Sequence, residues 1–324
     1  MFILRFAIRA PIDGPAKIHD MYKTAVDMAA WSEDKGCVMV GVPEHHSSPD
    51  GYIPSPLILA TAIAARTEQL RINIGALLLN MYDPVKLAED MTVLDIISRG
   101  RVSYTIGLGY RPEEYAMFGV PMNQRGKFMD KKLDALMSAL SGERFDYEGR
   151  QVHVTPSVFS ENGISMSYGG HSRAGMQRAG KYGLGVLADR ADPGLEVIYH
   201  EACRLAGQQP KNVIVPQEGE PATVYVAEDV DVAWETLGAY LLHDAHMYAQ
   251  WQQANQTSMT SFAKTIDDLR QEAVSYHILS IDEAVDWVRK GKPISTQPLC
   301  GGIPPDVAWQ YVNNIARVEE LARA

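Results

Sequence analysis

Short apolar runs alternate with amphipathic helical segments along nearly the whole chain, and this alternation constrains the fold more than any other feature. Residues 37–42 (CVMVGV) form a continuous apolar run, residues 70–79 (LRINIGALLL) are again strand-like, and helical segments follow them at 55–67 and 83–98. A strand that is apolar on both faces is typical of a parallel sheet whose two faces are covered. The pattern therefore predicts an α/β protein with parallel strands.

About eight such strand–helix units can be counted, without a break in composition or a linker rich in proline, glycine or serine. This number predicts a closed (β/α)₈ TIM barrel, with one domain over residues 1–324. We place its last strand at 297–302 and a variable insertion at about 217–296, helical over 230–253 and irregular or helical over 256–295. An open doubly wound sheet would need G-x-G-x-x-G at the first helix, and the first turn, RAPIDGPAK, does not match.

Composition and charge argue against a nucleic-acid-binding protein and against a membrane protein. The 324 residues carry a formal net charge of -10, which argues against a nucleic-acid partner, since phosphates would be repelled. Three cysteines at unrelated spacings fit a reducing cytosol. Arg5 and Arg9 interrupt the apolar amino terminus, and no apolar run is long enough to span a membrane. We expect a soluble, cytoplasmic protein without a membrane partner.

Three adjacent ionisable residues, Glu44, His45 and His46, follow the second predicted strand. They form a metal site, an acid/base site or a loop without a chemical role. Zinc needs three or four ligands, and the other histidines show no matching spacing, so a metal is disfavoured. A histidine is a natural general acid or base at neutral pH. Spacing alone leaves acid/base chemistry and a structural role both open.

Glycines mark the ends of the fourth and fifth predicted strands. Gly107 and Gly109 would suit a flat ligand lying against the backbone, although this signal is weak alone. At 169–173, two glycines precede Ser172, which can cap the next helix, and Arg173 adds positive charge; this arrangement suits phosphate, although an ordinary capped loop is the alternative. The segment 299–309 (LCGGIPPDVAW) competes for phosphate, but its two prolines remove amide donors.

Four stretches together resemble the bacterial luciferase-like monooxygenase family of flavin-dependent barrel enzymes. They are VPEHHSSPDGYIPSPLILATAIAART, GALLLNMYDPVKLAEDMTVLDIISRGRVSYTIGLGYRPEEYAMFG, YGGHSRAGMQRAGKYGLGV and PLCGGIPPDVAWQYVNNIARV. The resemblance covers most of the chain and is poorest over about 218–296. It implies a reduced flavin, FMN or the deazaflavin F420, at the carboxyl mouth of the barrel.

The resemblance also implies roles for single residues. His45 matches the catalytic histidine of the family, supported by Glu44 and His46. Gly75 and Ala76 match a position where members have a non-prolyl cis peptide behind the flavin ring. The cofactor-binding positions are Gly75, Ala76, Gly107, Leu108, Gly109, Tyr110, Tyr168, Gly169, Gly170, His171, Ser172 and Arg173. Gly107 occupies the position of the luciferase-type cysteine, and Leu108 occupies the position of the phosphate-binding arginine that follows it in luciferase. The positive charge for the phosphate must therefore come from another residue, such as Arg173.

We therefore expect a monooxygenase that uses reduced FMN, supplied by a separate flavin reductase, and O₂ to oxidise a small organic substrate. The alternatives are an F420-dependent hydride-transfer enzyme in the same pocket and a non-catalytic flavin-binding subunit. The segments 55–67 and 83–98 are apolar over more than one helix face, which predicts a homodimer that forms through these helices. The alternative is that the variable insertion covers their apolar faces.

Overall fold

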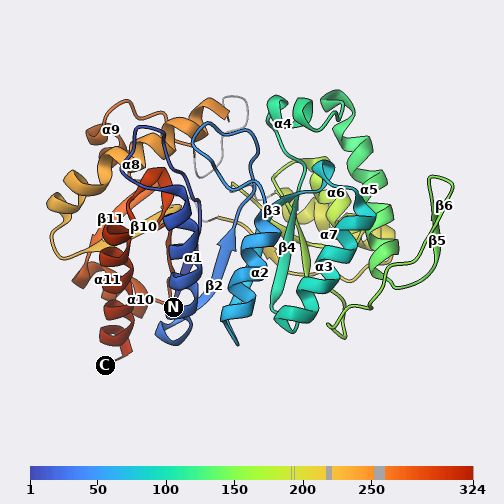
Figure 1. The fold of residues 1–324 in the computed structure, drawn as a ribbon, viewed down its shortest axis with the longest axis horizontal. Coiled ribbons are helices and arrows are strands. Elements are labelled where there is room, and N and C mark those ends of the chain that lie inside the picture. The colour runs from blue at the N-terminus through green and yellow to red at the C-terminus, as the bar shows by residue number, and fades with distance from the viewer. Residues whose placement is uncertain (191, 193, 217–220, 252–259, 324) are drawn as a thin grey trace. The chain divides into compact units, whose positions relative to one another are not determined.

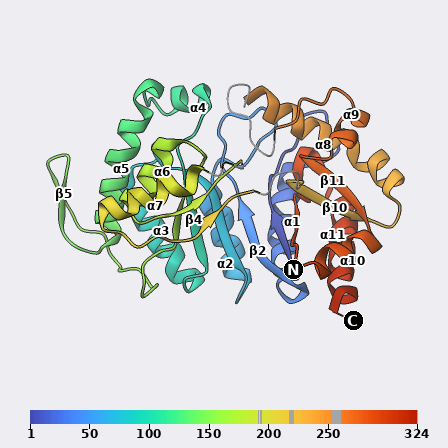
Figure 2. The same cartoon turned by 180° about the vertical axis from the view of Figure 1, so that it is seen from behind.

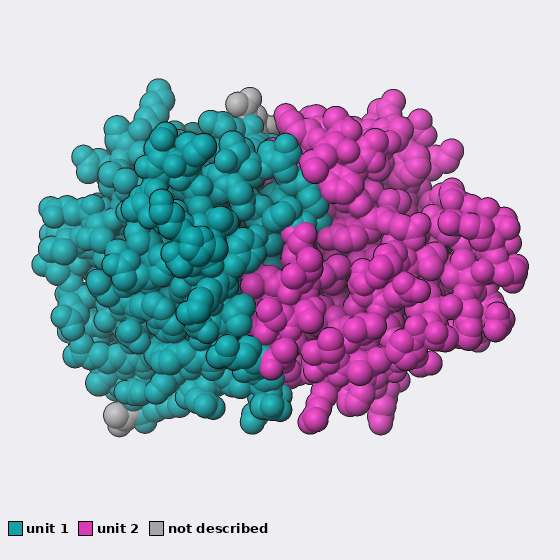
Figure 3. Space-filling model, in the orientation of Figure 1, with its two compact units in different colours: residues 1–54, 66–71, 218–324 teal, residues 55–65, 72–217 magenta. Residues whose placement is uncertain are grey.

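The computed structural model describes residues 1–190, 192, 194–216, 221–251 and 260–323. The chain contains two compact units, each described by itself (Figure 3). Unit 1 comprises residues 1–54, 66–71 and 218–324, and unit 2 comprises residues 55–65 and 72–217. The prediction of a single domain stays a prediction.

In unit 1, strand β1 (Phe2–Arg5) lies between β2 (Cys37–Val42) and β12 (Ile294–Thr296), and both pairings are parallel. Strands β10 (Thr223–Ala227) and β11 (Tyr276–Ser280) form a second parallel pair. The helices of this unit include α1 (Ile18–Ser32), α8 (Val230–Trp251), α9 (Ile266–Glu272), α10 (Ile281–Arg289) and α11 (Pro305–Arg323). Helices α10 and α11 lie beside β10 (Figure 1).

In unit 2, the strands are β3 (Arg71–Leu78, from residue 72 onward), β4 (Val102–Gly107), β7 (Met166–Gly169), β8 (Gly185–Leu187) and β9 (Val213–Ile214). They pair in that order, and every pairing is parallel. The helices are α2 (Pro56–Arg66), α3 (Pro84–Ser98), α4 (Pro112–Met117), α5 (Arg125–Leu140), α6 (Arg173–Lys181) and α7 (Gly194–Ala206). Helices α6 and α7 pack side by side (Figure 2), and β5 (Phe145–Tyr147) pairs with β6 (Arg150–Val152) as a hairpin.

Local sequence explains where several helices begin. The Asp83 side chain accepts hydrogen bonds from the amides of Val85 and Lys86, and Pro84 occupies the first position of α3, where an amide would have no partner. The Ser172 hydroxyl accepts from the amide of Gly175 and caps α6. Because these caps act over three residues, they could be identified from the sequence.

The predicted class, an α/β fold of the TIM-barrel type, is confirmed, and two details are corrected. The last strand is β12 rather than 297–302, because Pro298 has no amide to donate and Gly301 and Gly302 have positive φ. The predicted irregular or helical stretch contains a strand, β11, whose five residues are stabilised by pairing with β10. Residues 217–220 and 252–259 of the predicted insertion lie outside the described residues. Among the helices of the described chain, none is long and apolar enough to cross a membrane.

Candidate active site

Glu44, His45 and His46 follow β2 in unit 1, and their side chains divide as strand alternation predicts. Nε2 of His46 lies 2.8 Å from Oε1 of Glu44, and both side chains are buried. The His45 amide donates to the carbonyl of Ile53 at 2.9 Å, which holds the backbone of this loop. His45 is thus set apart from the Glu44–His46 pair, although its catalytic role stays a prediction.

The His45 imidazole lies among aromatic rings. Its centroid is 5.1 Å from that of Tyr52, edge to face, and 4.9 Å from that of Trp251 at the end of α8. The hydroxyls of Tyr52 and Tyr248 are 2.7 Å apart. Burial raises the pKa of Tyr248 to about 12, so that its phenol stays protonated at neutral pH. These aromatic rings surround the His45 imidazole, and they also lie against the guanidinium of Arg9.

A buried ion network follows β1, and sequence reasoning did not find it. Arg9 is fully buried; its Nε donates to Oδ1 of Asp244 at 2.5 Å and its Nη1 donates to Oδ2 of Asp50 at 2.9 Å. The hydroxyl of Tyr276 donates to Oδ2 of Asp244 at 2.6 Å. The guanidinium carbon also lies 4.3 Å from the centre of the Tyr52 ring, close enough for a cation–π interaction.

Charge and hydrogen bonding hold Asp50 ionised in this network. Burial alone would raise the pKa of Asp50, but the hydrogen bond from His243 and the charge of Arg9 outweigh it and keep that pKa well below its usual range. Asp50 and Asp244 are 41 and 235 residues from Arg9 along the chain. No local spacing in the sequence connects such residues, which is why the network was missed.

In unit 2, the peptide bond between Gly75 and Ala76 is cis, as the family resemblance implies. A Cβ atom added to Gly107 would lie 2.7 Å from Cβ of Ala76, closer than real side chains approach. A Cβ added to Gly169 would lie 3.0 Å from Cγ2 of Thr105. The glycines at the ends of β4 and β7 therefore allow close packing of backbone, and Gly107 leaves no room for the cysteine of luciferase.

The segment after β4 is held by side chains that sequence reasoning also missed. The hydroxyl of Tyr115 donates to the carbonyl of Leu108 and accepts from Nδ2 of Asn80 at 2.9 Å. Nη1 of Arg125 donates to the carbonyl of Gly109 at 3.1 Å. Tyr110, the last predicted residue of this segment, is partly buried. Tyr115 of α4 thus anchors the backbone at Leu108, and Arg125, the first residue of α5, anchors it at Gly109.

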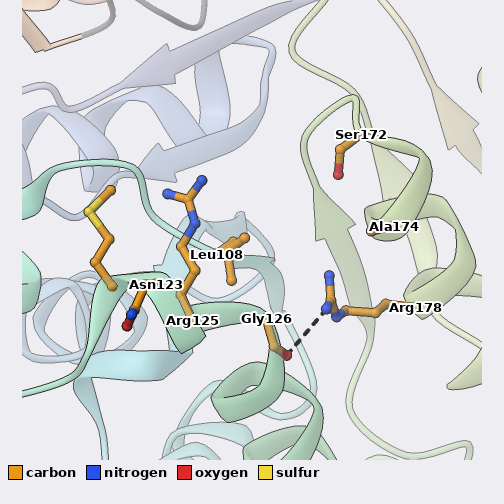
Figure 4. Close-up of a pocket in the computed structure, with 8 residues that line it drawn as sticks. Leu108, Asn123, Arg125, Gly126, Ser172, Ala174 and Arg178 are labelled. Atoms are coloured by element: carbon orange, nitrogen blue, oxygen red, sulfur yellow. Dashed lines mark hydrogen bonds between the residues drawn. The ribbon is translucent and has the colours of Figure 1, made fainter.

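A pocket of about 700 Å³ lies beside this segment (Figure 4). It is lined by Leu108, Met122, Asn123, Arg125, Gly126, Ser172, Ala174 and Arg178. Arg178 reaches from α6 toward α5, where its Nη2 donates to the carbonyl of Gly126 at 3.2 Å and its Nε donates to Asp130 at 2.6 Å. Arg173, predicted to supply charge, is exposed and does not line the pocket; the lining guanidiniums belong to Arg125 and Arg178.

The remaining predicted residues lie at the end of β7 and in the loop that leads to α6. Burial raises the pKa of Tyr168, whose side chain is almost inaccessible to water. Gly170 has φ +120°, and its amide donates to the carbonyl of Leu187 at 3.1 Å. Nδ1 of His171 lies 2.5 Å from Oδ1 of Asp189. Ser172 faces the pocket, whereas the lining does not include His171.

The structure thus sorts the predicted residues into two groups. Glu44, His45 and His46 belong to unit 1; the glycine-rich segments and the phosphate loop belong to unit 2. Within the described ranges, no cluster of three or more His, Cys, Asp or Glu side chains could hold a metal ion. His45 in unit 1 and the pocket in unit 2 are therefore two separate candidate positions, and the role of each stays a prediction.

Comparison with known proteins agrees with these features. Residues 2–285 match the sequence profile of the family described as "Luciferase-like monooxygenase". Limonene 1,2-monooxygenase of Rhodococcus erythropolis is 29% identical over 153 residues, which cover 45% of this chain and 38% of that protein. The chain therefore matches about two-fifths of the length of that curated relative.

Solved structures show the fold. Monooxygenase RslO1 of Streptomyces bottropensis superposes over all of both chains with a TM-score of 0.73 and 22% identity. The oxygenating constituent of 3,6-diketocamphane monooxygenase of Pseudomonas putida, in complex with FMN, has a TM-score of 0.67 and 16% identity over 96% of this chain and 97% of its own. An F420-dependent secondary alcohol dehydrogenase with an F420–acetone adduct has a TM-score of 0.65 and 17% identity over 100% and 99%.

Proposed function

The chain belongs to the luciferase-like monooxygenase family, and on this premise we propose that it is a flavin-dependent monooxygenase that uses reduced FMN and O₂ to oxidise a small organic substrate. The observation that carries the cofactor assignment is the pocket of unit 2. It combines two guanidiniums, the Ser172 hydroxyl and the first turn of α6, whose leading amides have no acceptor within the helix. This donor set suits a phosphate group.

The charges of the pocket favour one phosphate group. Arg178 is paired with the carboxylate of Asp130, so that its charge is largely compensated, whereas Nη1 of Arg125 donates to the backbone carbonyl of Gly109, which carries no charge. The two arginines and one carboxylate leave a surplus of one positive charge. A terminal phosphate such as that of FMN matches this surplus better than the longer anionic tail of F420, which is the alternative cofactor.

Each group of residues has a part in the proposed reaction. When bound, the reduced flavin would supply the electrons that activate oxygen. Arg125 and Ser172 bind its phosphate, while Gly107 and Gly169 let the ends of β4 and β7 pack closely against Ala76 and Thr105. His45 moves protons in a setting from which aromatic rings exclude water, while the Glu44–His46 pair supports the loop. The reduced flavin comes from a separate reductase.

Replacing Arg125 with methionine tests the cofactor assignment. We expect the wild-type protein to bind FMN, and Arg125→Met to raise the dissociation constant for FMN by roughly 10–100-fold, because a charge-assisted hydrogen bond contributes about 1.5–3 kcal/mol. Fluorescence titration with FMN measures this effect. Arg173→Met is the matched control, since its side chain is exposed and lies outside the pocket lining. A wild-type protein that neither binds FMN nor consumes oxygen with reduced FMN would contradict the proposed function.

Two other functions make different predictions. An F420-dependent enzyme would be reduced or oxidised through F420 without consuming oxygen, so reconstitution with each cofactor separates it from the monooxygenase. A non-catalytic flavin-binding subunit would bind FMN without turnover. The His45 imidazole beside the buried Glu44–His46 pair favours an enzyme, because it is a group that can transfer protons.

The proposal includes a homodimer through α2 and α3. Ile58 on α2 is 74% exposed, and Val93, Ile96 and Ile97 on α3 are 39–46% exposed, so both helices present apolar side chains to water in the single chain. Light scattering at micromolar concentration should give twice the mass of one chain. Ile97→Lys should lower this mass, and Val197→Lys, at a 71% exposed position on α7, should not. A monomeric wild-type protein would refute the dimer.

A further inference from the structure

The loop that follows β2 in unit 1, residues 43–54, carries His45 without support from regular secondary structure. The structure describes all of these residues, and they form neither helix nor strand. Such a loop keeps one conformation only where contacts with its surroundings offset the entropy that is lost on ordering it. The position of the His45 imidazole therefore depends on the side chains that fix this loop to the rest of the unit.

Asp50 fixes the loop to the segment that follows β1. Its carboxylate is 3% exposed and accepts hydrogen bonds from Nη1 of Arg9, at 2.9 Å to Oδ2 and 3.2 Å to Oδ1. The Ser48 hydroxyl, which belongs to the loop, donates to the same carboxylate. The backbone carbonyl of Asp50 accepts from the amide of Ala10 at 2.7 Å. Both the side chain and the backbone of Asp50 thus bind the residues after β1.

Asp50 also fixes the loop to α8. Nε2 of His243 lies 3.0 Å from Oδ2 of Asp50. Burial alone would raise the pKa of Asp50, but the hydrogen bond from His243 and the charge of Arg9 hold that pKa well below its usual range. Asp50 is therefore a carboxylate at neutral pH, and both of its oxygens accept hydrogen bonds. An amide at this position would have only one such oxygen.

The surroundings of His45 depend on where the loop lies against α8. Tyr52 belongs to the loop, and its hydroxyl is 2.7 Å from that of Tyr248 on α8. The centre of the His45 ring is 5.1 Å from that of Tyr52 and 4.9 Å from that of Trp251, the last residue of α8. His45 thus has one aromatic neighbour on its own loop and another on the helix. A displacement of the loop against α8 would move the His45 ring relative to Trp251.

We propose that Asp50 is a positioning residue for His45: its carboxylate fixes the loop to Arg9 and His243, and the fixed loop holds the His45 imidazole in place for proton transfer. The inference rests on the proposed function, in which His45 moves protons. It gives the buried cluster of Arg9, Asp50 and His243 a part in the rate of the reaction as well as in stability. Asp50 acts through the loop and not through contact with the substrate or the flavin.

Replacing Asp50 with asparagine tests this role in the enzyme. Asparagine has nearly the same size, but its amide group turns a donor toward partners that are themselves donors. We expect kcat to fall by roughly 10–100-fold, because a small misplacement of a catalytic group is costly in rate. The dissociation constant for FMN should stay within about two-fold of the wild type. Stopped-turnover assays give kcat, and fluorescence titration gives the affinity.

Asp95→Asn is the matched control for a loss of stability. The Asp95 carboxylate belongs to unit 2, is also buried, and accepts from the amides of Phe159 and Ser160 at 2.8 and 2.9 Å. This variant should unfold at a lower urea concentration than the wild type without a change in kcat. An Asp50→Asn protein that folds and retains the wild-type kcat would contradict the positioning role.

The signals of the His45 ring give a second test, which needs no turnover. In protein labelled with ¹³C at histidine, these signals are identified by their loss in His45→Ala. In the wild type, the ring currents of Tyr52 and Trp251 displace them from the values of a free histidine. We expect the displacement to decrease in Asp50→Asn and to stay unchanged in Asp95→Asn. Unchanged His45 signals in a folded Asp50→Asn protein would overturn the inference.

His243→Leu decides the question if Asp50→Asn does not fold. The His243 side chain is 33% exposed, and its replacement removes the contact with α8 but leaves the pair of Arg9 and Asp50 in place. We expect kcat to fall by roughly 2–10-fold, as for the loss of one hydrogen bond, and the His45 signals to move in the same direction as in Asp50→Asn. A kcat and His45 signals equal to those of the wild type would overturn the inference.

His246→Leu is the matched control on the same helix. Nε2 of His246 lies 3.0 Å from the carbonyl of Ala263 and not from the loop, so this variant should change neither kcat nor the His45 signals. A wild type that neither binds FMN nor consumes oxygen with reduced FMN would overturn the proposed function, and with it the part of Asp50 in the rate. Displaced His45 signals in Asp50→Asn would then still show that Asp50 fixes the position of His45.

Discussion

Replacing Arg9 with methionine is expected to lower the free energy of unfolding by about 3–5 kcal/mol. Methionine preserves much of the apolar stem but removes the charge that faces Asp244, whose carboxylate is buried with one remaining donor, the Tyr276 hydroxyl. An uncompensated buried charge costs far more than a lost surface contact. Urea unfolding followed by tryptophan fluorescence measures the change.

Two further variants test whether the unpaired charge of Asp244 causes the loss of stability. In Arg9→Met/Asp244→Leu, both charges of the pair are absent, and most of the lost stability should return, because a buried ion pair is often no more stable than the apolar residues that replace it. Arg317→Met is the matched control, since Arg317 pairs with Glu228 at 2.7 Å on the surface and its loss should not be measurable. An Arg9→Met protein within about 1 kcal/mol of the wild type would show that the network does not stabilise unit 1.

Replacing His45 with alanine is expected to reduce turnover with reduced FMN and oxygen by roughly 10²–10⁴-fold, the range that a general acid or base contributes. FMN affinity should stay within about two-fold of the wild type, because the phosphate contacts belong to unit 2. Product formation from a substrate found by screening gives the rate, and fluorescence titration gives the affinity.

A second histidine variant tests whether the loss of turnover is specific to His45. His200 is half exposed on α7, so His200→Ala should retain full turnover. His45→Gln keeps a polar side chain but cannot titrate; it should be as slow as His45→Ala if proton transfer is the role, and nearly as fast as the wild type if the ring only donates a hydrogen bond. Turnover that survives in His45→Ala would contradict the catalytic assignment.

The parts of the candidate site that lie at strand ends can be located from the sequence. The strand-like runs place Glu44–His46, Gly107–Tyr110 and Gly169–Ser172 at the carboxyl ends of β2, β4 and β7. Ser172 was identified as a cap because a cap acts within three residues. By contrast, Arg125 and Arg178 begin or lie within ordinary helices, and nothing in their own spacing distinguishes them from solvated arginines.

The fold class and the loops of the candidate site follow from the sequence, since hydrophobic period, caps and turns act over a few residues. The partners of those loops follow from tertiary packing, as do β11 and the position of the last strand. Arg9 meets Asp244 across 235 residues of chain, and Arg178 meets Asp130 across 48. Such pairs form because packing brings distant elements together, and a buried charge is stable only where its counter-charge is also buried.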